Sequence, residues 1–264
     1  MEKNRLSNKP KKSVLGSYLL LGLLSLLLTL VVLYEGYRKD ASEKISGNIF
    51  YESFGVEIPN QYAIHGIDVS KYQQQINWQN VQKLDAEGIK MGFVFVKATQ
   101  GLLAKDPFYK RNMQLARAAG LKVGAYHFFE PNVSGNLQAI NFINTVKLQA
   151  GDLPPVLDIE HINRKNPKKL REQLKIWLQL VEKAYGVKPI IYSNVKFYED
   201  YLGNEFGDYP FWAAHYYQPE APRINRSWLF WQHTQYATVD GIKGKVDLNV
   251  FKGDSVAFKA LLLP

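Results

Sequence analysis

Two acidic residues are separated by a single residue in the segment PPVLDIE, at residues 154–160. Alternate residues of a β-strand point to the same face, so Asp158 and Glu160 would lie side by side if this segment is a strand. Two carboxylates at close range repel each other, which raises the pKa of one and lowers that of the other. Such a split suits glycoside hydrolysis, which needs one protonated acid and one anion. Taken alone, the pair also fits a solvated strand edge or a cap.

Two further aspartates stand in segments that read as strands. Asp68 lies in HGIDVS, at residues 65–70, and Asp247 lies in GKVDLN, at residues 244–249. In β/α barrels the chemistry takes place at one rim, where the carboxyl ends of the parallel strands meet. If these segments belong to one barrel, we expect four carboxylates in one site.

The elements that must position these residues alternate through the first part of the domain. Apolar, β-branched runs predict buried strands, and stretches with helical periodicity separate them, which is typical of βαβ units and a parallel sheet. The predicted strands are 63–69, 91–98, 122–129, 155–160 and 189–193, and the predicted helices are 78–87, 108–119, 137–148 and 168–185. Candidate helix caps are Asn77, Ser134, Gly88, Gly120 and Gly186.

The pattern changes after about residue 203, where three predicted strands at 211–216, 228–234 and 245–251 have little helix between them. Five β/α units followed by three strands predict an α/β fold, an irregular TIM-like (β/α)5β3 barrel.

The order and spacing of several motifs resemble those of family-25 glycoside hydrolases, the lysozyme (N-acetylmuramidase) family. The resemblance covers residues 64–251 and thus nearly the whole domain. The matching segments are HGIDVSKYQ at 65–73, INWQNVQ at 76–82, FVFVKATQG at 93–101, DPFYKRN at 106–112, GLKVGAYHFF at 120–129, PPVLDIE at 154–160, PIIYSN at 189–194, FWAAHY at 211–216 and WQHTQYATVDGIKGKVDLNVF at 231–251.

The resemblance implies cleavage of the β-1,4 bond between N-acetylmuramic acid and N-acetylglucosamine, with net retention. It makes Glu160 the general acid. It gives Asp158 the task of stabilising positive charge at the sugar or orienting its 2-acetamido group, while Asp68 and Asp247 complete an acidic floor. One departure is Gln100, which stands where the family often has glutamate. This departure puts fine substrate contacts in doubt rather than the chemistry.

Aromatic residues near strand ends are candidates for stacking on sugar faces. We predict substrate-binding roles for Tyr126, Tyr192 and Trp212, and for Lys97, whose ammonium group could face the carboxylates. The alternatives are core packing for the aromatic residues and a solvent-directed ammonium group for the lysine. Phe128, Tyr216 and Trp231 are weaker candidates of the same kind.

Composition excludes several other classes of chemistry. The absence of cysteine removes disulfides, thiolate catalysis and Cys-ligated zinc. His127 and His161 lie near strand ends, but no H-x-H or H-E-x-x-H spacing occurs, so no metal and no cofactor are expected.

The net charge is +9, of which the first twelve residues carry +4 and no other long basic run exists. A nucleic-acid role is therefore not indicated, and we expect a monomer that acts on peptidoglycan glycan strands.

Residues 13–34 contain no charge and would span roughly 33 Å as a helix, the thickness of a bilayer core. A cleaved signal peptide is the alternative, but the run is long and lacks an A-x-A-like site. We expect a cytoplasmic tail at 1–12, an uncleaved transmembrane anchor at 13–34, a juxtamembrane connector at 35–61 and the hydrolase domain at 62–264. The basic flank places that domain on the periplasmic or extracellular face.

Two other functions remain open at this stage. One is a barrel that binds peptidoglycan with little or no catalysis. The other is a hydrolase of a different glycan that contains acetamido sugars. Retention of all four carboxylates argues against the first, and product analysis would separate the second.

Overall fold

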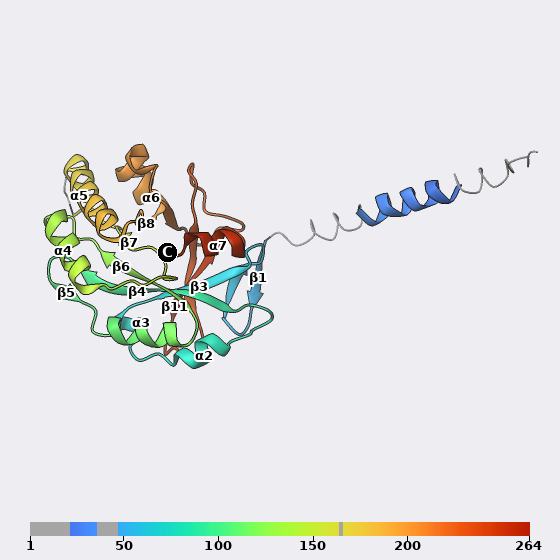
Figure 1. Ribbon diagram of the computed structural model, residues 1–264, viewed down its shortest axis with the longest axis horizontal. Coiled ribbons are helices and arrows are strands. Elements are labelled where there is room, and N and C mark those ends of the chain that lie inside the picture. Colours follow the sequence, from blue (N-terminus) through green and yellow to red (C-terminus); the bar gives the residue numbers. More distant parts are fainter. Residues whose placement is uncertain (1–21, 36–46, 164–165) are drawn as a thin grey trace, which may run out of the picture. The chain divides into compact units, whose positions relative to one another are not determined.

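The computed structural model describes residues 22–35, 47–163 and 166–264. The chain divides into two compact units, Met1–Ser46 and Gly47–Pro264. In the first unit, residues 22–35 form a helix whose leucine and valine side chains are exposed (Figure 1). Among the described residues, no helix combines the length and the apolar character needed to cross a membrane. The anchor predicted at 13–34 begins outside the described residues, as does the tail at 1–12, so both stay predictions.

The second unit is a closed barrel of eight strands. The strands are β3 (Ile64–Val69), β4 (Met91–Gln100), β6 (Lys122–Phe128), β7 (Val156–Asp158), β8 (Ile190–Asn194), β9 (Phe211–Ala214), β10 (Phe230–Ala237) and β11 (Val246–Phe251). Neighbours from β3 through β10 run parallel, and β11 closes the barrel antiparallel to both β10 and β3. The short strand β5 (Ala104–Lys105) extends the end of β4. The predicted α/β barrel of eight strands is confirmed; after β8, the fifth predicted β/α unit has only short helical turns instead of a long helix.

Helices follow the first four barrel strands: α2 (Trp78–Lys83), α3 (Tyr109–Ala118), α4 (Gly135–Thr145) and α5 (Pro167–Tyr185). Short helical turns η1 (Lys71–Gln73), α6 (Val195–Phe197), η2 (Tyr198–Leu202) and η3 (Gly203–Phe206) stand at loop positions, and α7 (Ser255–Leu261) ends the chain. Four predicted caps hold: the side chains of Asn77 and Ser134 accept hydrogen bonds from the N–H groups of Asn80 and Leu137, and Gly120 and Gly186, at φ 94° and 72°, end α3 and α5.

The helix predicted at 78–87 is shorter than expected, because the chain reverses direction after Lys83. Ala86 and Ile89 exchange two backbone hydrogen bonds, of 3.2 and 3.0 Å. Between them Glu87 and Gly88 both have positive φ, 56° and 90°. Two successive positive φ values are typical of a tight two-residue reversal, so Gly88 belongs to a turn rather than to a helix cap.

The folded unit begins at Gly47, whereas the sequence places the start of the domain at residue 62. Strands β1 (Asn48–Tyr51) and β2 (Val56–Pro59) form an antiparallel hairpin within the predicted connector. The hairpin is anchored by Phe54 and Ile58, which are fully buried in the main core. Strand β2 packs against β10, so the hairpin is an integral part of the barrel unit.

Large aromatic side chains fill the barrel interior. Phe95 stacks on Trp212 with a centroid distance of 4.6 Å, and Phe230 packs edge-on against Phe95 at 5.2 Å. A Cβ atom on Gly124 would lie 2.5 Å from the Phe95 ring, so only glycine leaves room for this ring. Phe258 of α7 packs on Phe251 at the end of β11. This packing leaves the opposite rim of the barrel for a binding pocket.

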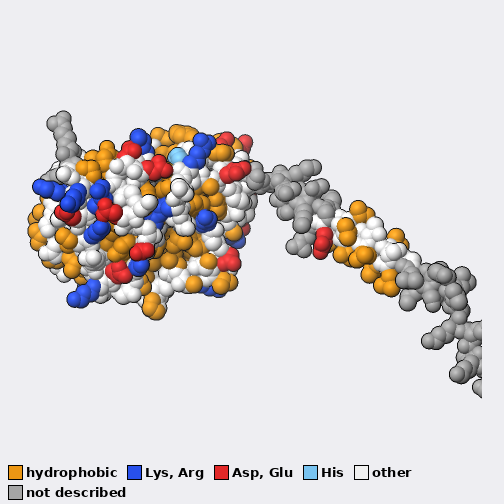
Figure 2. Space-filling view, turned by 90° about the horizontal axis from the view of Figure 1, so that it is seen from above, with side chains coloured by type: hydrophobic (Ala, Val, Ile, Leu, Met, Phe, Trp, Pro, Cys, Tyr) orange, Lys and Arg blue, Asp and Glu red, His pale blue; other side chains and the backbone are white. Residues whose placement is uncertain are grey.

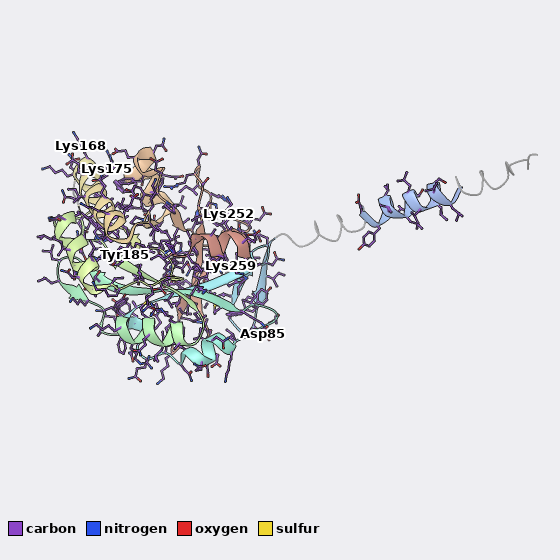
Figure 3. The ribbon with its side chains drawn as sticks, in the orientation of Figure 1. Asp85, Lys168, Lys175, Tyr185, Lys252 and Lys259 are labelled. Atoms are coloured by element: carbon purple, nitrogen blue, oxygen red, sulfur yellow. The ribbon has the colours of Figure 1, made fainter. Side chains whose placement is uncertain are left out.

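The surface of the barrel unit carries charges of both signs. On the face seen in Figure 2, Lys and Arg side chains are interspersed with Asp and Glu side chains. Lys168 and Lys175 project from α5 (Figure 3), and Lys175 pairs with Glu205 at 2.6 Å. At the other end of α5, the Tyr185 hydroxyl donates to the Val146 carbonyl at 3.1 Å and ties α5 to the end of α4.

Candidate active site

A pocket of about 250 Å³ opens at the rim where the parallel strands end. All eight residues that the sequence proposes for the site line it, which brings Asp68, Lys97, Tyr126, Asp158, Glu160, Tyr192, Trp212 and Asp247 together. The remaining lining residues are Ser70, Tyr72, Phe128, Tyr216, Gln232 and Gln235. The pocket is thus walled by aromatic rings around a group of four carboxyl groups.

Asp158 and Glu160, the first carboxyl pair, lie at the end of β7. The strand ends at Asp158, whereas the sequence predicted that it would end at Glu160. The backbone of Ile159 is nevertheless fixed to β8: its N–H donates to the Tyr192 carbonyl at 3.0 Å, and its carbonyl accepts from Ser193 Oγ at 2.7 Å. Asp158 is buried and Glu160 is exposed. The pair therefore has one member at the floor of the pocket and one within reach of solvent.

The pKa values of the pair are not split up and down, as the sequence argument expected; burial raises both. Burial and then repulsion from Glu160 raise the pKa of Asp158 well above its usual range, with Lys97 acting in the opposite sense. The pKa of Glu160 is raised by burial although its surface is accessible, because the surrounding pocket walls displace solvent. A hydrogen bond with Tyr192 lowers it in part. The pair therefore retains a proton more readily than free carboxyl groups do.

Asp68 and Asp247 form a second carboxyl pair, because β3 and β11 align them as direct neighbours. Burial, followed by repulsion from Asp68, raises the pKa of Asp247 to about 9. Burial also raises the pKa of Asp68, to about 6, while hydrogen bonds from Asn249 and Gln232 oppose that rise. The raised pKa of Asp247 favours its protonated form, which can donate a hydrogen bond to the Asp68 carboxyl group.

Two amide residues that the sequence analysis missed hold Asp68 in place. Gln232 Nε2 and Asn249 Nδ2 each donate to Asp68 Oδ2 at 2.8 Å. Asn249 follows Asp247 at the same i, i+2 spacing that separates Asp158 and Glu160. This spacing indicated that the Asn249 side chain points to the same face as Asp247. Gln232 carries no comparable signal, because its role depends on β10 pairing with β11, where it faces Asn249.

The aromatic residues divide into those that contact the pocket's polar groups and those that pack below it. The hydroxyls of Tyr192 and Tyr216 donate to Gln232 Oε1 at 2.9 and 2.6 Å. Trp212 is only 2% exposed, and its indole N–H donates to Asn249 Oδ1 at 2.8 Å. Trp212 thus forms the base of the pocket. Trp231 does not line it; the ring is fully buried and its N–H donates to the His215 carbonyl at 2.8 Å.

Lys97 lies near Asp158, and its ammonium group is held in place by Gln100 and Phe128. Its Nζ donates to Gln100 Oε1 at 2.9 Å and lies 4.5 Å from the centre of the Phe128 ring. Gln100 in turn donates to Glu130 Oε1 at 2.7 Å. Burial lowers the pKa of Lys97, and the nearby Asp158 opposes that change. The glutamine that departs from the expected motif therefore positions the lysine of the pocket.

Neither of the two histidines noted near strand ends lines the pocket. His127 is fully buried between Thr99 and Gln138, with ring nitrogens 2.7 and 3.1 Å from their side-chain oxygens. Burial lowers the pKa of His127 to about 3, so it is neutral in the folded protein. His161 lies 3.4 Å from Glu130. No group of three potential metal ligands occurs in the described part of the chain.

The fold and the carboxyl-lined rim define a glycoside hydrolase of the β/α-barrel class. A family model described as glycosyl hydrolases family 25 matches residues 67–242. The chain is 48% identical to the protein YegX of Escherichia coli K12 over 202 residues, covering 76% of this chain and 74% of YegX. It is 34% identical to Lysozyme M1 of Streptomyces globisporus, covering 75% and 71% of the two chains.

A solved family 25 glycosyl hydrolase from Bacillus anthracis superimposes with a TM-score of 0.70 at 32% sequence identity, covering 77% of this chain and 95% of that one. The chain belongs to glycosyl hydrolase family 25. It is accordingly a lysozyme-type glycoside hydrolase.

Proposed function

We propose that this chain is a membrane-tethered muramidase that hydrolyses the β-1,4 bond between N-acetylmuramic acid and N-acetylglucosamine in peptidoglycan. Family membership supports a lysozyme-type reaction, and a 29% identical relative is the autolytic lysozyme of Clostridium acetobutylicum. The observation that carries the proposal is the pair of Asp158 and Glu160 in one pocket with Asp68 and Asp247.

Glu160 is the general acid. Its raised pKa favours the protonated form, and its exposed position lets it reach the oxygen of a glycosidic bond that lies across the pocket. Transfer of its proton to that oxygen allows the leaving sugar to depart as an alcohol. The resulting Glu160 carboxylate then accepts a proton from the water that attacks the other sugar, which restores the acid.

Asp158 acts on the sugar whose bond breaks. Its Oδ1 atom is buried and has no hydrogen-bond partner among the described residues. A buried acceptor without a partner is costly, and a donor from the substrate removes that cost. The N–H of a 2-acetamido group is such a donor, and holding it would direct the acetamido oxygen toward the anomeric carbon. Stabilisation of a positively charged sugar by the ionised Asp158 is the alternative role.

Asp68, Asp247, Gln232 and Asn249 support the pocket floor. The shared proton between the two aspartates leaves this pair with about one negative charge at neutral pH. Fewer charges at the floor reduce repulsion on Asp158. We assign Tyr126, Tyr192, Trp212 and Lys97 to substrate binding because all four line the same pocket.

The uncharged segment at 13–34 supports an anchor, and the basic residues before it support a cytoplasmic N-terminus. The barrel would then act on the periplasmic or extracellular side, where peptidoglycan lies. Cell fractionation with protease protection tests this arrangement. Recovery of the protein mainly as a released soluble form would contradict the tether.

The test of the activity is digestion of purified peptidoglycan followed by mass spectrometry and identification of the new reducing ends. A muramidase leaves N-acetylmuramic acid at these ends. Cleavage of chitin oligosaccharides in preference to peptidoglycan would instead indicate another acetamido-sugar glycan as substrate. Binding without turnover would indicate the binding barrel considered above.

A further inference from the structure

A second cavity, of about 400 Å³, adjoins the catalytic pocket on the side of the N-terminal hairpin. Tyr216 and Gln235 line both cavities, so the two are continuous along the rim. The far wall of the second cavity comes from the hairpin, through Asn48, Phe50, Val56 and Glu57. The hairpin precedes residues 67–242, which match the family model.

Three aromatic side chains of this cavity are exposed to solvent. Phe50, Tyr217 and Tyr236 are 58%, 85% and 50% exposed, and we call them the hairpin platform. Exposed apolar side chains gathered at one place are typical of binding sites rather than of inert surface. Around them stand the polar groups of Asn48, Thr234 and Gln235. Flat rings beside amide and hydroxyl groups suit a sugar, which has an apolar face and polar edges.

The backbone that presents Tyr217 is constrained. Tyr217 has φ 57°, a left-handed conformation that a bulky residue rarely adopts. The hairpin holds this turn, because Asn48 Nδ2 donates to the carbonyl of the next residue, Gln218, at 3.0 Å. Gln61 Nε2 and the Tyr62 hydroxyl donate to the Glu220 carbonyl and hold the following part of the loop. A strained conformation held by its surroundings, with an outward-facing aromatic ring, points to function.

We propose that the hairpin platform is an additional glycan-binding subsite, which holds sugar units of the same peptidoglycan strand beyond those in the catalytic pocket. The inference rests on the proposed muramidase function for the identity of the glycan. Continuity through Tyr216 and Gln235 is what makes the strand itself the occupant, because a chain that leaves the catalytic pocket on this side runs over the platform. The subsite makes the enzyme favour long glycan strands over short fragments.

The test compares hydrolysis of polymeric peptidoglycan glycan with hydrolysis of a tetrasaccharide fragment, using the full chain. In the double variant Phe50→Ala/Tyr217→Ala, the ratio of kcat/KM for the long to the short substrate falls about tenfold, mainly through KM, since stacking by aromatic rings is of this magnitude. Tyr236→Ala gives a smaller fall in the same direction. Val256→Ala, which truncates a 73% exposed side chain on α7, is the matched control and leaves the ratio unchanged. An unchanged ratio in the double variant and in Tyr236→Ala overturns the subsite.

A binding measurement separates this inference from the muramidase assignment. The Glu160→Gln variant is sedimented with insoluble peptidoglycan, with and without Phe50→Ala/Tyr217→Ala. Weakening of binding by about tenfold supports the platform even if the parent chain proves inactive as a muramidase. Equal binding by the two variants counts against the platform even if the parent chain cuts peptidoglycan. Thermal unfolding at the same temperature confirms that the exposed substitutions leave the fold intact.

Discussion

Asp68 on β3 and Asp247 on β11 are direct partners across two antiparallel strands, and both side chains line the floor of the pocket. The ionised member, Asp68, accepts three hydrogen bonds, from Asp247, Gln232 and Asn249. The protonated member, Asp247, is only partly buried. This relationship fixes the charge beneath the reacting pair and gives the protein a characteristic response to pH.

The pH response appears in stability. The pKa of Asp247 is raised to about 9 and that of Asp68 to about 6 in the folded state, above the ordinary range of an unfolded aspartate. At pH values between the unfolded and the folded pKa of each aspartate, the folded state binds more protons than the unfolded state. The free energy of unfolding therefore decreases as pH rises through this interval. From pH 7 to 9 Asp247 contributes to this decrease, and so does Asp158, whose pKa is also raised by burial.

Asp247→Asn therefore reduces the loss of stability between pH 7 and 9, since asparagine cannot release a proton but still donates to Asp68. The measurement is chemical denaturation of both proteins at the two pH values. A variant that loses as much stability as the parent over this interval would contradict the shared proton. Asp240→Asn, at an exposed position, is the control and keeps the parent's slope.

Glu160→Gln removes the proposed proton donor while keeping the size of the side chain. We expect kcat on peptidoglycan to fall by roughly 10²–10⁴-fold, the usual contribution of a positioned general acid. Because Glu160 is exposed, the melting temperature should change little. Glu205→Gln, on the surface turn η3, provides a control that retains activity. Activity within a factor of about two of the parent would refute the role of Glu160.

Asn249→Leu breaks two hydrogen bonds at once, those to Asp68 Oδ2 and from Trp212 Nε1. Both partners are buried, so we expect a loss of roughly 2–4 kcal/mol in the free energy of unfolding, about 1–3 for each unpaired group with partial relaxation. The pKa of Asp68 should rise further, because a donor that opposes the rise is gone. Denaturant titration and the acid limb of the kcat/KM profile measure these effects. Val256→Leu on the exposed face of α7 should show neither.

Gly135→Ala tests how closely α4 approaches α5. A Cβ atom at Gly135 would lie 2.1 Å from the carbonyl oxygen of Gln173, so the two helices must separate. We expect a destabilisation of roughly 1–3 kcal/mol, as for other overpacked sites. Gly207→Ala is the matched control, because its added Cβ would lie 3.5 Å from the nearest atom. Equal melting temperatures of the two variants would show that the helices can separate freely.

Much of the fold was predictable because local patterns determine it. Buried strands alternate with amphipathic helices up to β8, and Ser134 and Gly186 bound two helices as their residue types predict. The predicted end of α2 was too late in the sequence. The chain reversal at Glu87 and Gly88 requires a positive φ at Glu87, which a glutamate residue does not indicate. The hairpin at 48–59 was missed, because burial of Phe54 and Ile58 depends on β10, far away in the sequence.

The sequence by itself determined the chemistry available to this protein: four carboxyl groups, their residue types and the i, i+2 spacing of Asp158 and Glu160. Only the tertiary structure decided where they stand. Asp247 is the second residue of its strand, yet it joins the others because β11 runs antiparallel and starts at the rim where the parallel strands end. Only packing decided their pKa values, because burial raises those of both Asp158 and Glu160, where repulsion alone would have split them.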